Sequence, residues 1–254
     1  MLPSSIDADG RASERQHLLC LVIDDKVAID AGSLAFSCTD LQRQQIRDVV
    51  LTHTHLDHIA GLPLFIDDLF SSLERPVCVH ATPEMIDILE THVFNWAVYP
   101  RFSELTNANG RVLEYRGFSA GDTFDVGHLS ITSVRVNHEV SACGYIVSDG
   151  KISVGITGDT AETDDFWKLC NERDDLAAIL VECAFPNDLA ELAHVSCHLT
   201  PNGLQEELEK LSNKQCPTYL INLKPMYRER VVAEVNSLGL PNTRILDIGR
   251  VYDF

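Results

Sequence analysis

Four side chains of the kind that bind metal ions lie within six positions of the segment LTHTHLDHIAGL, residues 51–62. They are His53, His55, Asp57 and His58. Side chains two residues apart in an extended segment point the same way, so His53 and His55 can bind one ion from one side. Asp57 and His58 are offset and can serve a second ion. Because imidazole and carboxylate together suit Zn, Mn or Fe better than Ca or Mg, the segment predicts a transition-metal site.

The elements around this segment should hold it at the end of a buried strand. The run RDVVLT, residues 47–52, predicts a strand that leads directly into the histidines. Two earlier apolar runs, HLLCLVID and KVAIDAG, predict a hairpin of buried strands. After the histidines in the sequence, the segment LPLFIDDLF has apolar residues at helical spacing and predicts a helix. The segment TPEMIDILETHVF predicts a helix with Thr82 as its N-cap and Pro83 in its first turn.

The later part of the chain predicts a hairpin followed by alternating strands and helices. CGYIVSDGKISVGITGD has SDGK as its turn, and Asp159 follows its second strand, where a carboxylate can bridge two metal ions. The strand LAAILVE ends at Glu182, which could orient a ligand histidine. A helix with Thr200 as its cap, a strand TYLINL and a helix ended by Gly239 come next. Since hairpins are frequent, we expect a layered α/β sandwich over residues 1–254, as a single domain, rather than a purely parallel sheet.

Charge and cysteine content narrow the partners and the compartment. The net charge is −18 and no Lys/Arg cluster is present, which disfavours a nucleic acid polymer. A small anionic substrate remains compatible, because bound metal reverses the local field. The eight cysteines form no C-x-x-C pair and are typical of a reduced, cytoplasmic protein. No run approaches the about 18 apolar residues of a membrane span, and residues 1–16 predict no signal peptide.

Three segments resemble motifs of the metallo-β-lactamase fold hydrolases. IDAG (29–32) is similar to an early strand-end motif, THTHLDHIAGL to the central signature, and GDT (158–160) to the motif of the metal-bridging aspartate. The resemblance implies a four-layer αββα sandwich. A narrower similarity, to the class II cyclic-nucleotide phosphodiesterases, rests on the ordered set HVFNWAVYPRF, ECAFPN, HLTP and INLKP. The N-terminal segment MLPSSID enters a loop almost at once, so the family's first strand is expected to be missing or different.

The resemblance implies two divalent metal ions, zinc first and Mn or Fe as alternatives. The ligands that it implies are His53, His55 and His138 for the first ion, and Asp57, His58 and Asp159 for the second. His198, in HLTP, resembles a residue next to the substrate phosphate that acts as general acid or stabilises charge.

Asn222 departs from the family pattern. The family places its last metal-binding histidine in a motif of the form T-H-I-K-P, and this chain has INLKP with Asn222 at that position. An amide oxygen is a much poorer zinc ligand than imidazole. Three outcomes stay open: a weaker second ion, an ion of a harder type, or an ion completed by water or another side chain such as His198. Catalytic efficiency is then expected to be reduced.

The aromatic segment THVFNWAVYP could stack on a flat nucleotide base. The residues expected to bind substrate there are Phe94, Asn95, Trp96 and Tyr99. Stacking competes with a simpler interpretation, in which these aromatic side chains only cover hydrophobic surface. The exposed aromatic segment also leaves a homodimer open.

The resemblance implies hydrolysis of the 3′,5′-cyclic nucleotides cAMP or cGMP to nucleoside 5′-monophosphates by a metal-bound hydroxide, which Asp57 would orient. Two alternatives remain. One is another hydrolase of the same fold, such as an RNase Z-like nuclease, a lactonase or a thioesterase. The other is a metal or nucleotide sensor without turnover, which Asn222 alone supports.

Overall fold

The computed structural model describes residues 18–254, which form two compact units, Leu18–Ser119 and Ala120–Phe254. The predictions for residues 1–16, a missing signal peptide and an altered first strand, lie outside the described residues. The single domain over residues 1–254 stays a prediction. None of the helices in residues 18–254 has the length and apolar content that crossing a membrane requires.

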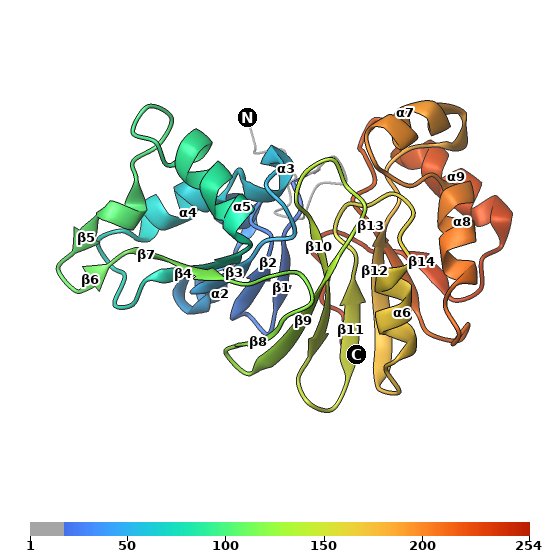
Figure 1. The fold of residues 1–254 in the computed structure, drawn as a ribbon, viewed down its shortest axis with the longest axis horizontal. Helices are drawn as coiled ribbons and strands as arrows, with labels where there is room; N and C mark the ends of the chain where they lie inside the picture. The colour runs from blue at the N-terminus through green and yellow to red at the C-terminus, as the bar shows by residue number, and fades with distance from the viewer. Residues whose placement is uncertain (1–17) are drawn as a thin grey trace. The chain divides into compact units, whose positions relative to one another are not determined.

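A five-stranded sheet forms the centre of the first unit, in the order β1-β2-β3-β4-β7 (Figure 1). Its strands are β1 (Leu21–Ile23), β2 (Val27–Ile29), β3 (Asp48–Val50), β4 (Val77–Ala81) and β7 (Leu113–Gly117). β1 and β2 form the predicted antiparallel hairpin, and the other neighbours pair in parallel. Every residue of β2 and β4 is buried, so these strands carry the core.

Short helices surround this sheet. They are α1 (Leu34–Ser37), α2 (Asp40–Gln45), α3 (Leu56–Ile59), α4 (Leu62–Leu69) and α5 (Pro83–Ile88). α5 starts as predicted, with the Thr82 side chain accepting a hydrogen bond from the backbone N–H of Met85. It then widens into a π-helical turn, η1 (Leu89–Val93), and a 3₁₀ turn, η2 (Phe102–Glu104), follows. A small hairpin, β5 (Thr106–Asn107) and β6 (Gly110–Arg111), completes the unit.

The second unit has a seven-stranded sheet in the order β14-β13-β12-β11-β10-β9-β8. Its strands are β8 (Thr123–Val126), β9 (Leu129–Arg135), β10 (Cys143–Ser148), β11 (Ser153–Ile156), β12 (Leu176–Glu182), β13 (Thr218–Ile221) and β14 (Thr243–Ile245). β8 to β11 pair antiparallel, including the predicted hairpin with the SDGK turn. β11 to β14 pair in parallel.

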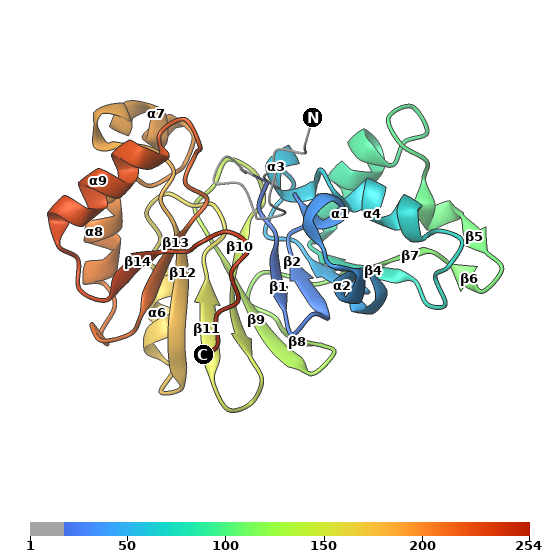
Figure 2. The same cartoon turned by 180° about the vertical axis from the view of Figure 1, so that it is seen from behind.

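Helices connect the parallel strands of the second unit (Figure 2). They are α6 (Asp165–Asn171), α7 (Ala190–Val195), α8 (Pro201–Glu209) and α9 (Arg228–Leu238), with a 3₁₀ turn, η3 (Asn187–Leu189), before α7. Thr200 caps α8 and Gly239, at φ 59°, ends α9, both as predicted. Apolar side chains of α6, α8 and α9 bury themselves against β12 in one core cluster. Sheets flanked by helices in both units confirm the α/β class.

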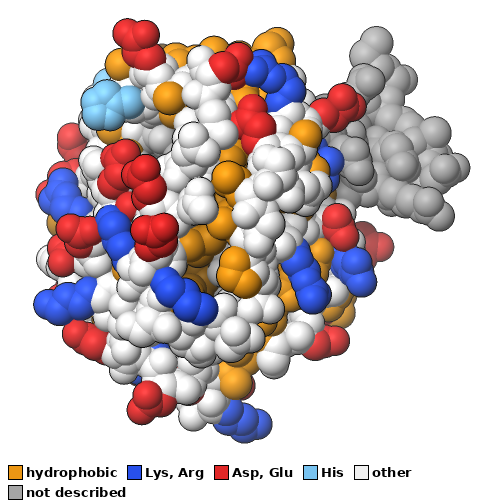
Figure 3. Space-filling model, turned by 90° about the vertical axis from the view of Figure 1, so that its right-hand side faces the viewer, with side chains coloured by type: hydrophobic (Ala, Val, Ile, Leu, Met, Phe, Trp, Pro, Cys, Tyr) orange, Lys and Arg blue, Asp and Glu red, His pale blue; other side chains and the backbone are white. Residues whose placement is uncertain are grey.

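The face of the molecule in Figure 3 carries charged side chains of both signs. Lys and Arg side chains lie between Asp and Glu side chains on that face, and apolar side chains show between them. The whole chain has 20 basic and 38 acidic residues, so acidic side chains outnumber basic ones. This face offers no stripe of the kind that tracks a phosphate backbone.

Candidate metal centre

The loop after β3 brings the predicted ligands of the first unit together. The ring centroids of His53 and His55 are 4.7 Å apart, and those of His53 and His58 are 4.0 Å apart. His55 is the N-cap of α3, whose first turn carries Asp57. Asp57 Oδ2 lies 4.0 Å from Nε2 of His58. Three imidazoles and one carboxylate therefore lie together in the loop after β3 and the first turn of α3.

A buried network behind this loop orients His58. Asp30 is fully buried and accepts three hydrogen bonds of 2.7 Å, from the backbone N–H of Thr52, the hydroxyl of Thr52 and Nδ1 of His58. Burial raises the pKa of Asp30, and the neighbouring His58 opposes that rise. Because Nδ1 of His58 donates to Asp30, Nε2 is the nitrogen left to coordinate a metal. Asp30 was not predicted as a site residue, although the IDAG motif pointed to its strand end.

Backbone contacts fix the same loop from the side of IDAG. The N–H of Ala31 donates to the carbonyl of His58 at 2.7 Å, and the N–H of Gly61 donates to the carbonyl of Ala31 at 3.0 Å. A Cβ at Gly32 would lie 1.9 Å from the carbonyl oxygen of Asp57. Only glycine allows so close an approach, which explains the residue type at this position.

The second unit places a cluster of titratable groups at the carboxyl ends of its parallel strands. Asp159 follows β11, Glu182 ends β12, and His198 precedes α8. Each of these three offers a ligand atom within 4.8 Å of the other two. Asp159 and Glu182 are buried, and Oε2 of Glu182 has no hydrogen-bond partner. Sheets of parallel strands commonly bind ligands at this edge.

Glu182 holds His198 directly. Nδ1 of His198 lies 2.7 Å from Oε1 of Glu182 and 3.9 Å from Oδ2 of Asp159. Burial alone would lower the pKa of His198, but the charge and hydrogen bond of Glu182 raise it above its usual value. Burial raises the pKa of Glu182, against the opposing effect of His198. Glu182 thus orients His198 and favours the protonated form of its ring.

His138 is oriented by a strained backbone position. Its Nδ1 lies 3.1 Å from the carbonyl oxygen of Cys197, and Cys197 has a left-handed φ of 51°. Its ring centroid is 5.3 Å from that of His198. With Nδ1 donating to a carbonyl, Nε2 is again the nitrogen suited to a metal.

Asn222 lies directly after β13, with a left-handed φ of 52°. Its Nδ2 donates a hydrogen bond of 2.6 Å to Oδ1 of Asp159. Asn222, which departs from the family pattern, thus donates a hydrogen bond to the predicted metal ligand Asp159.

The aromatic segment divides into supporting and exposed residues. Phe94 is fully buried and packs against Phe102, with ring centroids 5.8 Å apart, which favours a core role for it. Asn95 Oδ1 accepts hydrogen bonds from the next loop N–H groups, and Tyr99 donates its hydroxyl to Asp67. Trp96, at φ 68°, is 57% exposed. Of the four predicted contacts, Trp96 presents the largest open ring face.

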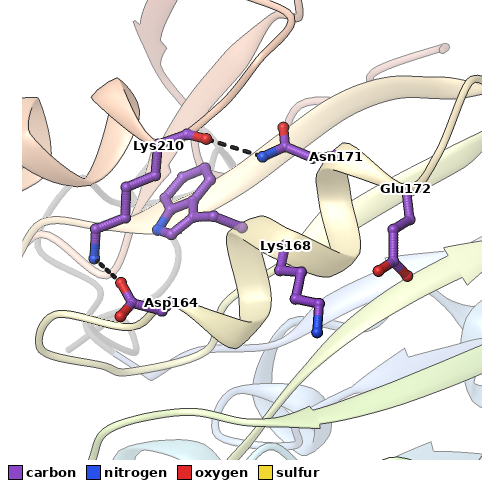
Figure 4. A pocket seen from close by; sticks show the side chains of 6 residues that line it. Asp164, Lys168, Asn171, Glu172 and Lys210 are labelled. Atoms are coloured by element: carbon purple, nitrogen blue, oxygen red, sulfur yellow. Dashed lines mark hydrogen bonds and ion pairs between the residues drawn. The ribbon is translucent and has the colours of Figure 1, made fainter.

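A pocket of the second unit lies elsewhere, between α6 and the end of α8 (Figure 4). It is lined by Asp164, Trp167, Lys168, Asn171, Glu172 and Lys210. Lys210 donates to Asp164 and to the buried Glu207, so its charge is already compensated. None of the predicted site residues lines this cavity.

The donor chemistry of each unit fits divalent metal. In the first unit, hydrogen bonds engage Nδ1 of His58 and leave Nε2 for coordination. In the second unit, buried carboxylates of Asp159 and Glu182 lie beside an imidazole, an arrangement in which a cation offsets the cost of burying negative charge. Imidazole and carboxylate ligands together suit Zn, Mn or Fe.

The family model of the cAMP phosphodiesterases class-II matches residues 35–234. The chain belongs to this class II phosphodiesterase family. A probable 3′,5′-cyclic-nucleotide phosphodiesterase from Yersinia pestis is 25% identical over 211 residues, which cover 74% of this chain and 60% of that protein. This class II chain thus spans somewhat more than half the length of that curated relative.

Solved structures confirm the predicted metallo-β-lactamase fold. Unliganded yeast PDE1 superposes with a TM-score of 0.68 at 23% identity, over 82% of this chain and 69% of that one. The metallo-β-lactamase fold protein YhfI from Bacillus subtilis gives a TM-score of 0.71 at 17% identity, over 92% of this chain and 89% of that one. At these identities the likeness speaks for the fold of this class II chain and not for its substrate.

Proposed function

We propose that this chain hydrolyses 3′,5′-cyclic nucleotides to nucleoside 5′-monophosphates with two divalent metal ions. The observation that carries the proposal is the class II family match, which spans residues 35–234 and so includes every predicted ligand. The hydrogen-bonded imidazoles and buried carboxylates of both units support it. We further propose that both units contribute ligands to the same pair of ions, as the family resemblance implies.

In this proposal each ligand keeps its predicted place. The first ion is held by His53, His55 and His138, and the second by Asp57, His58 and Asp159. When bound, the ions supply Lewis acidity and lower the pKa of a coordinated water toward about 7. Asp57 accepts a hydrogen bond from the attacking oxygen and orients it. Asp30 and the Cys197 carbonyl keep their histidines aimed through Nε2.

His198 supplies the proton for the leaving 3′ oxygen. The bond from phosphorus to this oxygen would break as the oxygen of a hydroxide, formed when a water loses one proton to solvent, bonds to phosphorus, and a proton would move from the His198 imidazolium to the leaving alkoxide. Two observations support this role. Nδ1 is held by Glu182, so Nε2 is the nitrogen that would donate, and the charge and hydrogen bond of Glu182 raise the pKa of His198 against the effect of burial, which favours the protonated ring. General acids work best when their pKa lies near the working pH.

The substrate side of the proposal is a small, anionic molecule with a flat base. The exposed ring of Trp96 supports base stacking, worth about 0.5–1.5 kcal/mol beyond buried area. The net charge of −18 and the mixed charges of Figure 3 support a small substrate over a polynucleotide. A cytoplasmic location and a homodimer belong to the proposal as well; the mass of the protein in solution tests the dimer.

Steady-state hydrolysis of cAMP and cGMP by the protein loaded with Zn²⁺ or Mn²⁺ tests the proposed function. We expect turnover to the 5′-monophosphate, and we expect His55→Ala to lose metal and turnover together. Metal and nucleotide binding without turnover would favour a sensor. Turnover of a tRNA 3′ end, a lactone or a thioester, with none of either cyclic nucleotide, would favour another hydrolase of this fold.

A further inference from the structure

Three neighbouring parallel strands of the second unit end in polar side chains of different kinds. β11, β12 and β13 lie side by side in the sheet. Asp159 follows β11, Glu182 ends β12 and Asn222 follows β13. The amide of Asn222 therefore reaches across the end of β12 to the carboxylate that follows β11. This contact joins residues 63 positions apart in the chain.

The backbone at Asn222 is suited to asparagine. Its φ of 52° lies in the left-handed region, which asparagine adopts more readily than most residues. Histidine is also enriched there relative to bulky residues, so the backbone alone does not exclude the family's residue. The side chain, rather than the backbone, distinguishes this chain at the position.

The hydrogen bond shows which end of the amide faces the carboxylate. Nδ2 of Asn222 lies 2.6 Å from Oδ1 of Asp159, and an amide N–H₂ group only donates. A metal ligand needs a lone pair, which this nitrogen does not offer. Oδ1 of Asp159 thus accepts a hydrogen bond from Asn222, whereas a histidine at this position would offer a nitrogen lone pair to a metal ion.

We propose that Asn222 is a positioning residue that fixes Asp159, and that its presence shifts the second metal position from zinc toward manganese. The inference rests on the proposed function, because it assumes that Asp159 is a ligand of that ion. With Asn222 as a donor, the predicted set for the second ion is one imidazole, of His58, and two carboxylates. Imidazole suits Zn²⁺, whereas carboxylate and water suit Mn²⁺, so the loss of one imidazole favours the harder ion. The hydrogen bond to Asp159 keeps the bridging carboxylate oriented in place of that ligand.

Metal binding to the intact, metal-stripped protein tests this without any measurement of turnover. Titrations with Mn²⁺ and Zn²⁺, followed by isothermal calorimetry and by the spin-resonance signal of Mn²⁺, give the affinity for the first and the second equivalent. Asn222→Gly keeps the left-handed backbone and removes the amide. We expect it to weaken the second Mn²⁺ by about 10- to 100-fold and to leave the first unchanged. Asn222→His should raise the preference of the second position for Zn²⁺ over Mn²⁺ by a similar factor.

The matched control is Asn242→Gly. Asn242 also has a left-handed backbone, at φ 55°, and its amide donates to the carbonyl of Lys214 on the surface of the same unit. This variant should bind both ions as the parent chain does. A second-equivalent Mn²⁺ affinity in Asn222→Gly equal to that of the parent would overturn the positioning role. An unchanged Zn²⁺ to Mn²⁺ preference in Asn222→His, or a parent chain that binds only one equivalent, would overturn the metal preference.

The outcome separates the inference from the proposed function. Should the expected metal affinities be found while neither cyclic nucleotide is hydrolysed, the inference stands and the substrate assignment is wrong. Should turnover be found while Asn222→Gly leaves the metal affinities unchanged, the proposed function stands and the positioning role of Asn222 is wrong. Circular dichroism of each metal-stripped variant shows whether it is folded, and the first-equivalent affinity reports an intact loop in the first unit.

Discussion

Replacing Asp30 by asparagine tests how far the metal loop depends on the network behind it. The two side chains have the same shape, and both tolerate the left-handed backbone of this position, at φ 59°. The substitution therefore changes hydrogen bonding and charge with little effect on the backbone. The asparagine oxygen can still accept a hydrogen bond from the backbone N–H of Thr52, but the N–H₂ group then faces Nδ1 of His58. Nδ1 must therefore act as an acceptor, and the proton of the ring moves to Nε2.

The size of the effect follows from one lost contact. The bond from His58 Nδ1 to Asp30 is 2.7 Å long and joins two fully buried side chains. A hydrogen bond to a charged partner contributes about 1.5–3 kcal/mol. Since a factor of ten is about 1.4 kcal/mol, the loss corresponds to roughly 10- to 150-fold in affinity for the ion that His58 binds. Folding should change less, because asparagine also removes the burial penalty that raises the pKa of Asp30.

The assay is a competition titration of the metal-stripped Asp30→Asn variant with Zn²⁺ and a chromophoric chelator, with its urea denaturation curve alongside. The matched control is Asp24→Asn, the same substitution at an exposed turn position with φ 49°. The control should keep the parent's affinity. If Asp30→Asn binds both equivalents as tightly as the control, then the network does not orient His58 and the reasoning fails.

Four other variants test separate parts of the site and the fold. His198→Ala should keep both metal ions and lower kcat by at least about 100-fold; preserved turnover would exclude the proton-donor role. Trp96→Ala should raise KM for cAMP several-fold at unchanged metal content, and an equal KM would remove the stacking contact. Glu207→Leu leaves two buried N–H groups without an acceptor and removes one of the two carboxylates that pair with Lys210, so it should lower the free energy of unfolding by about 3 kcal/mol in urea denaturation. Burial acts to raise the pKa of Asp48, but the hydrogen bond and charge of His80 hold that pKa below its usual value. The stability from this ionised carboxylate is lost as pH falls through that lowered pKa, and Asp48→Asn should flatten this loss in acid denaturation.

Local signals in the sequence predicted the elements that end or begin at a cap. Thr82, Thr200 and Gly239 act within their own turns, so the residue type alone indicates the boundary. The π-helical turn Leu89–Val93 escaped prediction because its wider spacing continues an ordinary helical pattern. The sequence thus predicts boundaries well where one side chain satisfies the adjacent backbone.

Site residues with distant partners were harder to predict. The loop ligands followed from their types and spacing, since one short segment carries them all. Asp30 reaches His58 across 28 positions, and Asn222 reaches Asp159 across 63, so neither partner lies within any local pattern. The same holds for the Cys197 carbonyl, which is a backbone group and leaves no trace in residue type.

Several of the strained backbone positions are predicted site residues or residues that contact one. Seven non-glycine residues among those described have a positive φ, and Asp30, Trp96, Cys197 and Asn222 are four of them. Left-handed backbone costs an ordinary residue roughly 1–2 kcal/mol, and less at asparagine or aspartate. Glycine at these four positions would relieve the strain but remove each side chain. The chain therefore gives up some thermal stability to aim its groups, and thermostable variants of it should be sought at the other three positive-φ positions, Asp24, Asp25 and Asn242.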